Sequence, residues 1–526
     1  MYIDNKIWIA NDGNGEHICI LPKMTNRHGL VAGATGTGKT VTLKVLAETF
    51  SDMGVPVFMA DVKGDIAGIM NPGKTSEDME ERMARFGLAD KGFDFRGYPV
   101  NLWDIYGEKG CQLRTTITEM GPLLLSRILD LNELQSNIMS IAFKIADDEG
   151  LILDDTKDLK ALMNYINENN KTFSAEYGKM SPASIGAIMR AIVALEVEGG
   201  DNFFGEPALN INDWITTVPD GRGMINILDS ESLINNGRLY STFLLWLLSE
   251  LFEMLPEVGD LEKPKMIFFF DEAHLLFKGA PKALLEKIEQ VVKLIRSKGV
   301  GVYFCTQNPR DIPDGVLAQL SNKIQHGLHA YTPSDQKAVR AAADSFRTNP
   351  EFNTYETILQ LGTGEAVVSF LDEDGIPTMA QKAYILPPRS SFGSITDGER
   401  DKCVKGSLLY GKYASGSDRD SAYELLLRKG LEEEEAKKKA AEAAAAQKEA
   451  EKEAEREAKE AAKAEAAKKK QVESAAKSVG SSVAGTVGRE VGKAVGGNFG
   501  KFGKTLGGNL GASLGRGILS TLFKLK

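Results

Sequence analysis

The sequence contains few cysteines and no long uninterrupted apolar run. Its four cysteines are scattered without the paired spacing of a zinc site or a disulfide framework, which fits a reducing compartment. The longest apolar stretch, residues 243–255, is interrupted by Glu250 and Glu253 and is too short to span a bilayer. Residues 1–6 lack the charged-then-apolar pattern of a secretory signal. We therefore expect a cytoplasmic protein.

The chain also lacks an excess of positive charge. Its formal net charge is −10 over 526 residues, which argues against a non-specific polyanion binder. An acidic exterior is still compatible with a basic central channel. Hydrophobic residues make up 42% and charged residues 26% of the chain, enough for a large core. At this length we expect two or three domains.

The most informative stretch, residues 30–40, has the pattern G-x-x-x-x-G-K-T between an expected strand end and an expected helix. Glycines let successive backbone N–H groups point into one hollow, where a phosphate can approach closely. The helix that follows adds unpaired N–H groups and the positive end of its dipole. We expect Lys39 to reach the β- and γ-phosphates and the Thr40 hydroxyl to ligate Mg²⁺. The positions of this phosphate loop are Gly33, Ala34, Thr35, Gly36, Thr37, Gly38, Lys39, Thr40 and Val41.

A second motif is an apolar run at residues 266–270 that is followed by Asp271 and Glu272. Such a run is typical of a strand buried between helix layers, and the carboxyl ends of these strands form the ligand-binding edge of an α/β sheet. We expect Asp271 to hold the Mg²⁺ shell and Glu272 to be the general base that polarises the attacking water. Paired acids are usually solvated surface groups, but the strand context favours catalysis here.

Further polar residues are candidates for the same site. Gln307 ends the strand expected at residues 300–307 and is suited either to contact a γ-phosphate or orient water, or to cap a turn. Phosphoryl transfer also needs a cation where charge develops, and the candidates are Arg27 and Arg296, each equally compatible with a surface arginine. Asp61 and Lys63 follow another expected strand and belong either to the ligand-binding edge or to a capped turn.

Strand and helix patterns alternate along most of the chain, which predicts an α/β fold with a mostly parallel sheet. Residues 111–205 instead show i, i+3, i+4 apolar spacing without strand runs, which indicates an all-helical insertion. The expected parts are a P-loop ATPase core at 1–110 and 206–395, the insertion at 111–205, a linker at 396–430, a charged Glu/Ala/Lys helix at 431–477 and a glycine-rich basic amphipathic tail at 478–526.

The tail has a distinctive glycine spacing. From 488 to 515 glycines recur every four residues, with one three-residue step, beside an apolar stripe in the same phase. Such a segment is suited to lie on an anionic membrane, such as the inner membrane, or to pack against another tail or protein. Disorder is the competing interpretation, because each glycine costs a helix about 1 kcal/mol.

Taken together, these motifs resemble the HerA/FtsK superfamily of additional-strand, RecA-like P-loop ATPases, and most closely its HerA-like helicase branch. The resemblance covers roughly residues 20–390. It rests on residues 26–40, 61–64, 270–274, 296–302, 306–309, 320–328 and 364–369. In the HerA proteins a β-barrel of about a hundred residues precedes the core, whereas residues 1–29 precede it here.

The resemblance implies a homo-oligomeric, hexameric ring that holds ATP and Mg²⁺ between subunits and pumps duplex DNA through its centre. It implies that Arg27 is donated across the interface and that Arg296 senses the γ-phosphate. Two alternatives stay open. One is a motor with protein or single-stranded nucleic acid as cargo, for which Lys278, Lys282 and Lys293 are either channel cations or a solvated helix face. The other is a nucleotide-gated scaffold that docks to a membrane or a partner through the tail.

Overall fold

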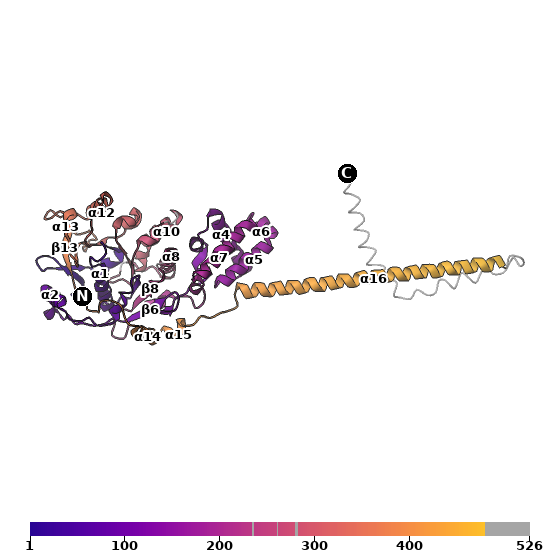
Figure 1. Cartoon of the computed structure of the whole chain (residues 1–526), viewed down its shortest axis with the longest axis horizontal. Helices are drawn as coiled ribbons and strands as arrows, with labels where there is room; N and C mark the ends of the chain where they lie inside the picture. Colours follow the sequence, from indigo (N-terminus) through magenta and orange to yellow (C-terminus); the bar gives the residue numbers. More distant parts are fainter. Residues whose placement is uncertain (234–235, 260, 279–281, 479–526) are drawn as a thin grey trace. The chain divides into compact units, whose positions relative to one another are not determined.

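The computed structural model describes residues 1–233, 236–259, 261–278 and 282–478. The predicted contacts of the tail with membrane or protein therefore fall outside the described residues, from 479 onward. The chain divides into two units, the first Met1–Leu431 and the second from Glu432 onward. In the first unit one 13-stranded sheet is combined with helices (Figure 1).

The sheet has a parallel centre and an antiparallel side. Its order is β1-β2-β13-β12-β11-β4-β10-β9-β5-β8-β6-β7, and β3 pairs with β2. All pairings from β11 to β7 are parallel, and those among β1, β2, β3, β13, β12 and β11 are antiparallel. The predicted α/β fold with a mostly parallel sheet is confirmed. The strands are β1 (Tyr2–Ile3), β2 (Lys6–Asn11), β3 (His17–Ile20), β4 (Gly29–Ala32), β5 (Val57–Asp61), β6 (Val100–Asp104), β7 (Cys111–Gln112), β8 (Ile225–Asp229), β9 (Met266–Phe270), β10 (Val300–Thr306), β11 (Asn322–Gln325), β12 (Glu365–Ser369) and β13 (Gln381–Ile385).

The central strands are apolar throughout because both of their faces are buried. Along β9, Phe268 and Phe270 belong to one hydrophobic core while Ile267 and Phe269 belong to another. This split follows the alternation of side chains along a strand. Helix α1 (Lys39–Asp52) contributes to the second core, and α3 (Ile117–Ile128), α8 (Gly237–Met254) and α10 (Lys282–Ile295) contribute to the first.

The remaining helices are short connections, the insertion and the chain's later part. They are α2 (Glu77–Phe86), α4 (Glu133–Glu149), α5 (Thr156–Glu168), α6 (Asn170–Tyr177), α7 (Pro182–Val197), α9 (His274–Phe277), α11 (Asp314–Leu317), α12 (Pro333–Asp344), α13 (Thr354–Gln360), α14 (Asp397–Gly406), α15 (Tyr410–Tyr413) and α16 (Ala422–Ser478). Short 3₁₀ helices include η1 (Pro22–Arg27) and η7 (Arg296–Lys298).

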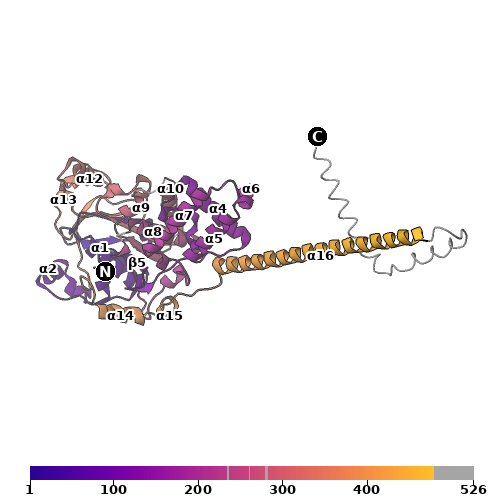
Figure 2. The ribbon, with the colours of Figure 1, turned by 45° about the vertical axis from the view of Figure 1, so that its right-hand side comes forward.

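Residues 117–197 contain five helices, and three of them, α3, α4 and α5, begin at a capping box. The side chains of Thr116, Asn132 and Asp155 cap α3, α4 and α5 by accepting from the N–H of the third helical residue. The side chain of that third residue accepts in return from the N–H of the cap. Figures 1 and 2 show α4–α7 gathered into one cluster beside the sheet. Among the described helices, none alone has the length and apolar composition to cross a membrane, and only α6 and α7, taken together across a 103° bend, meet that criterion.

Residues 396–430, which we expected to be a linker, contain α14, α15 and the first turns of α16 and lie within the first unit. Just before this segment, residues 389–390 form a strap that is bound to α1 through the buried carboxylate of Glu48. This carboxylate accepts hydrogen bonds from the N–H groups of Arg389 and Ser390 at 2.9 and 3.0 Å. Since α1 begins directly after the phosphate loop, the strap stabilises the helix that presents the loop.

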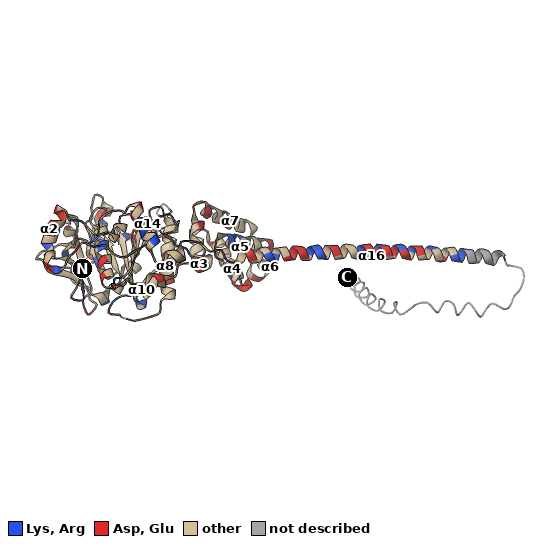
Figure 3. Ribbon diagram, turned by 90° about the horizontal axis from the view of Figure 1, so that it is seen from below, with Lys and Arg blue, Asp and Glu red and all other residues tan. Residues whose placement is uncertain are grey.

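In the second unit, the described part of α16 carries both charge signs along its length (Figure 3). Glutamates four residues ahead of lysines form ion pairs, as in Glu433–Lys437, Glu435–Lys439 and Glu455–Lys459. Residues 432–470 are exposed, so this helix depends on its alanine content and such i,i+4 pairs, worth about 0.2–0.5 kcal/mol each.

Candidate active site

The phosphate loop lies between β4 and α1, as the sequence predicts. Gly38 caps α1 with a φ of 110°, a left-handed conformation that favours glycine. A Cβ on Gly38 would lie 3.1 Å from the backbone nitrogen of Gly364, so a side chain there would also crowd the neighbouring backbone. The Nζ of Lys39 donates to the carbonyls of Gly33 and Ala34 at 2.7 and 2.9 Å. The lysine is 8% exposed, and burial lowers its pKa.

Two segments that are distant in sequence form backbone hydrogen bonds to the phosphate loop. The N–H of Ala34 donates to the carbonyl of Gly327 at 2.9 Å, and the N–H of Gly364 donates to the carbonyl of Thr37 at 3.1 Å. Between them lies the buried imidazole of His326, whose Nδ1 bonds to the carbonyl of Glu365 at 2.9 Å. The first of these segments follows β11 and the second precedes β12. The connection between these strands, which contains α12 and α13, is therefore hydrogen-bonded to the phosphate loop at both of its ends.

The tautomer of His326 follows from these partners. Because a carbonyl only accepts, Nδ1 carries the proton, and Nε2 accepts from the hydroxyl of Thr42 on α1 at 2.9 Å. Burial lowers the pKa of His326 to about 4, so the ring is neutral near pH 7. Nothing in the local sequence pattern indicates this contact.

The predicted acid pair lies two strands from the loop. In the order β4-β10-β9, Gln307 follows β10, and Asp271 and Glu272 follow β9. Because these strands are parallel, their carboxyl ends meet at one edge, and the charges of Asp271 and Glu272 act on Lys39. The structure therefore brings Lys39, Asp271, Glu272 and Gln307 together.

The side chain of Glu272 is held in place by two polar neighbours. The Nε2 of Gln307 donates to its carboxylate oxygens at 3.2 and 3.4 Å, and the Nδ1 of His274 lies 3.3 Å away. The backbone of Glu272 has a φ of 47°, a left-handed conformation that costs a non-glycine residue about 1–2 kcal/mol. Such strain clusters at functional sites.

The environment of Asp271 favours a positive ligand. Burial and then the neighbouring Glu272 raise the pKa of its carboxyl group, while the N–H of Glu272 donates to it at 2.9 Å. The hydroxyl of Tyr240, from α8, donates to the backbone carbonyl of Asp271 at 2.9 Å and fixes this turn. A nearby cation would lower that pKa and stabilise the carboxylate.

The oxygen donors at this edge suit Mg²⁺. Asp271 supplies a carboxylate and Thr40 a hydroxyl, both of them hard ligands. In the described part of the chain, no group of three or more His, Cys, Asp or Glu side chains is arranged to hold a metal. Few protein ligands are usual for Mg²⁺, which keeps waters and takes phosphate oxygens.

Asp61 forms a capped turn at the end of β5. Its carboxylate accepts bonds from the N–H groups of Asp65, Ile66 and Ala67 at 3.2, 2.9 and 3.2 Å. Burial raises its pKa to about 6. Lys63 in the same turn is exposed, and its charge acts on Lys39 and Asp271, so it lies near the site.

The comparisons with known proteins identify the family of this chain. The sequence profile of the family described as helicase HerA-like C-terminal matches residues 6–504. This chain belongs to that family. The predicted resemblance to HerA-like proteins is confirmed.

Curated relatives of this HerA-like chain are distant. A probable helicase of Methanocaldococcus jannaschii is 29% identical over 161 residues, which are 30% of this chain and 28% of that protein. The DNA double-strand break repair helicase HerA of Sulfurisphaera tokodaii is 23% identical over 370 residues, 68% of this chain and 65% of that protein. The chain thus spans less than two thirds of either relative. A solved structure of the bacterial conjugative coupling protein TrwB gives a TM-score of 0.47 at 16% identity, over 72% of this chain and 89% of that one.

Arg27 and Arg296 lie at the amino ends of the parallel strands, whereas the phosphate loop lies at their carboxyl ends. Arg27 ends η1 just ahead of β4, and Arg296 begins η7 just ahead of β10. His28, next to Arg27 in the chain, accepts from the N–H of Val302 at 3.0 Å, and its pKa is lowered to about 4 mainly by burial and also by the charge of Arg296. The length of β10 alone corresponds to about 20 Å. The two arginines are therefore near each other but not near the acid pair of their own chain.

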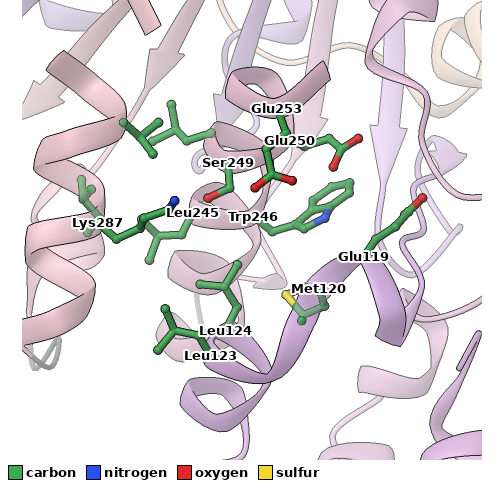
Figure 4. Close-up of a pocket in the computed structure, with 14 residues that line it drawn as sticks. Glu119, Met120, Leu123, Leu124, Leu245, Trp246, Ser249, Glu250, Glu253 and Lys287 are labelled. Carbon is green, nitrogen blue, oxygen red and sulfur yellow. The ribbon is translucent and has the colours of Figure 1, made fainter. Parts of the chain in front are cut away.

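A separate cavity of about 300 Å³ lies between α3, α8 and α10 (Figure 4). Its walls are mostly apolar, with Trp246 and Leu245 from α8 and Leu124 from α3, and with Glu250 and Lys287 among its polar groups. Burial raises the pKa of Glu250 to about 7. None of the predicted site residues lines this cavity, so it is distinct from the phosphate-loop site.

Proposed function

We propose that this HerA-like chain hydrolyses ATP and couples hydrolysis to the movement of DNA. The observation that carries the proposal is the convergence of the phosphate loop, the acid pair and Gln307 on one edge of the sheet. The similarity to a protein named as a DNA double-strand break repair helicase supports DNA as the cargo.

Each residue of the site has a physical role in this proposal. The loop N–H groups and Lys39 bind the triphosphate, for which the lysine exchanges its bonds to the carbonyls of Gly33 and Ala34 for bonds to phosphate oxygens. Glu272 accepts the proton of the attacking water, and Gln307, already bonded to Glu272, orients that water. Thr40 and Asp271 would hold Mg²⁺, which when bound supplies Lewis-acid stabilisation of phosphate charge.

The cation that phosphoryl transfer requires comes, in this proposal, from a neighbouring copy. Arg27 and Arg296 occupy the edge opposite to the phosphate loop. In a head-to-tail ring that edge of one copy faces the phosphate loop of the next, so both arginines would act across the interface. A ring of such copies, hexameric as the resemblance implies, is part of the proposal.

The experiment compares steady-state ATP hydrolysis by the full chain and by Glu272→Gln, each with and without duplex DNA. We expect DNA to stimulate the wild type and the substitution to reduce kcat at least about a hundredfold, the lower range for a general base. Exposed Glu289→Gln, on α10, is the matched control and should behave as the wild type. Equal rates in all four main reactions would refute the motor, and stimulation by single strands alone would replace the duplex as cargo.

A further inference from the structure

A further cavity, lined by both polar and apolar side chains, adjoins β11. It has a volume of about 420 Å³. Two cations and three serines from separate parts of the chain line it. They are Lys323 on β11, Arg347 after α12, Ser321 before β11, Ser345 at the end of α12 and Ser369 at the end of β12. The sequence motifs gave no role to any of these side chains.

The cavity is at the amino edge of the parallel strands. Asn322, the first residue of β11, is in register with Gly29, the first residue of β4, whereas the phosphate loop follows the last residue of β4. Antiparallel pairing of β11 with β12 then places Ser369 opposite Lys323. The N–H of Ser321 donates to the carbonyl of Arg27 at 3.3 Å, so the cavity adjoins the edge that carries the two arginines.

No carboxylate among the lining residues balances the positive charges of Lys323 and Arg347 in this cavity. The Nζ of Lys323 donates to the carbonyl of Ser345 at 2.8 Å, which satisfies one of its three donors. Arg347 is exposed, and its Nη1 lies 3.4 Å from the carbonyl of Pro377. All the lining residues belong to the described part of the chain, and none of them is acidic.

A half-buried ammonium group without a carboxylate is unfavourable. Burial lowers the pKa of Lys323, and no charged neighbour contributes to that shift. Buried charges are normally paired. An anion with several acceptor oxygens would satisfy the remaining donors of Lys323 and the guanidinium of Arg347 together, and the serine hydroxyls suit the same oxygens.

We propose that this cavity is a phosphate-binding site in which Lys323 and Arg347 hold the phosphate group. The group is either that of a nucleotide or that of a nucleic-acid backbone, which share this chemistry. The site goes beyond the proposed function because it is separate from the phosphate loop and takes no part in hydrolysis within its own chain.

The direct test is calorimetric titration of the full chain with inorganic pyrophosphate. It uses a Lys39→Ala background, so that the phosphate loop does not dominate the signal. Adding Lys323→Met or Arg347→Gln should weaken binding at least about tenfold, because a charge-assisted hydrogen bond contributes roughly 1.5–3 kcal/mol and 1.4 kcal/mol is tenfold. Lys323→Arg should keep binding, and Lys337→Met, an exposed cation on the neighbouring α12, is the matched control.

Two outcomes would overturn the site: no pyrophosphate binding by the Lys39→Ala chain at millimolar concentrations, or binding that Lys323→Met leaves unchanged. Thermal unfolding of Lys323→Met checks that the variant is folded, and Met is expected to be tolerated because it keeps the apolar stem. Loss of binding in a folded Lys323→Met chain with retention in Lys323→Arg supports the proposal.

Further measurements identify the source of the phosphate. If it is a nucleic-acid backbone, Lys323→Met in a chain with Lys39 intact should reduce the slope of log K for DNA against log salt by about one. If it is a nucleotide, that slope stays the same, and in the Lys39→Ala background Lys323→Met weakens the binding of ATP instead. Failure of the wild type to hydrolyse ATP would refute the proposed function but not this site, because the pyrophosphate titration requires no turnover.

Discussion

Removing one hydroxyl behind the phosphate loop should weaken both the fold and nucleotide binding. Thr42→Val keeps the shape of the side chain but removes its hydrogen bond to Nε2 of His326, a bond of 2.9 Å to a ring that is 0% exposed. An unpaired buried acceptor costs about 1–3 kcal/mol. We expect the free energy of unfolding to fall by that amount. Where 1.4 kcal/mol of this loss appears as weaker binding of ATP by the loosened phosphate loop, the KM for ATP rises tenfold.

The assay combines urea unfolding with ATP titration of hydrolysis. The rise in KM should come with little change in kcat, because the loop binds the phosphates in the ground state and the transition state alike. Thr42→Ser, which keeps the hydroxyl, is the matched control and should retain the wild-type KM. A Thr42→Val chain with wild-type stability and wild-type KM would show that His326 does not position the loop.

Two further predictions concern buried ionisable groups. Burial lowers the pKa of His326 from 6.5 to about 4, so its neutral form contributes stability above pH 6.5 that is lost as pH falls towards 4, by up to about 1.4 kcal/mol per pH unit. His326→Asn removes this contribution, so the difference in unfolding free energy between wild type and variant should narrow across that window, and a constant difference would contradict the assignment. Glu48→Ala should lower the free energy of unfolding by about 2 kcal/mol or more in urea titrations, because the buried N–H groups of Arg389 and Ser390 lose their acceptor. The exposed Glu16→Ala is its control, and equal stability of the two variants would refute the anchoring role.

The parts of the site that the sequence predicted are those with a local signature. The glycine spacing and Lys39 define the phosphate loop, and an apolar run that ends in Asp271 and Glu272 defines a buried strand that ends at the ligand-binding edge. Gln307 was found in the same way, as a polar residue at a strand end. The structure brings these residues together because their strands are parallel and adjacent in the order β4-β10-β9.

Contacts that depend on strand order were not predictable. His326 reaches the loop because β11 pairs with β4, and Tyr240 reaches the acid pair from a helix on one face of the sheet. His274 is the exception, since it follows the acid pair closely, but its 3.3 Å contact with Glu272 could be recognised only once the conformation of the turn was known. Likewise, the positions of Arg27 and Arg296 at the opposite edge follow from where their strands begin. Because residues 396–430 are polar in composition, we predicted a linker there and did not predict α14 and α15, the short helices of the first unit.

Equilibrium binding of labelled ATP is the most direct test of the account, because the central claim is that the phosphate loop binds the triphosphate and Glu272 activates water to split it. The titration compares the wild type with Lys39→Ala and Glu272→Gln, and the fate of the bound nucleotide is followed by its release as ADP. The account predicts that Lys39→Ala loses binding, while Glu272→Gln binds as the wild type does and releases almost no ADP. Binding by Lys39→Ala that equals that of the wild type, or wild-type release of ADP by Glu272→Gln, would contradict it.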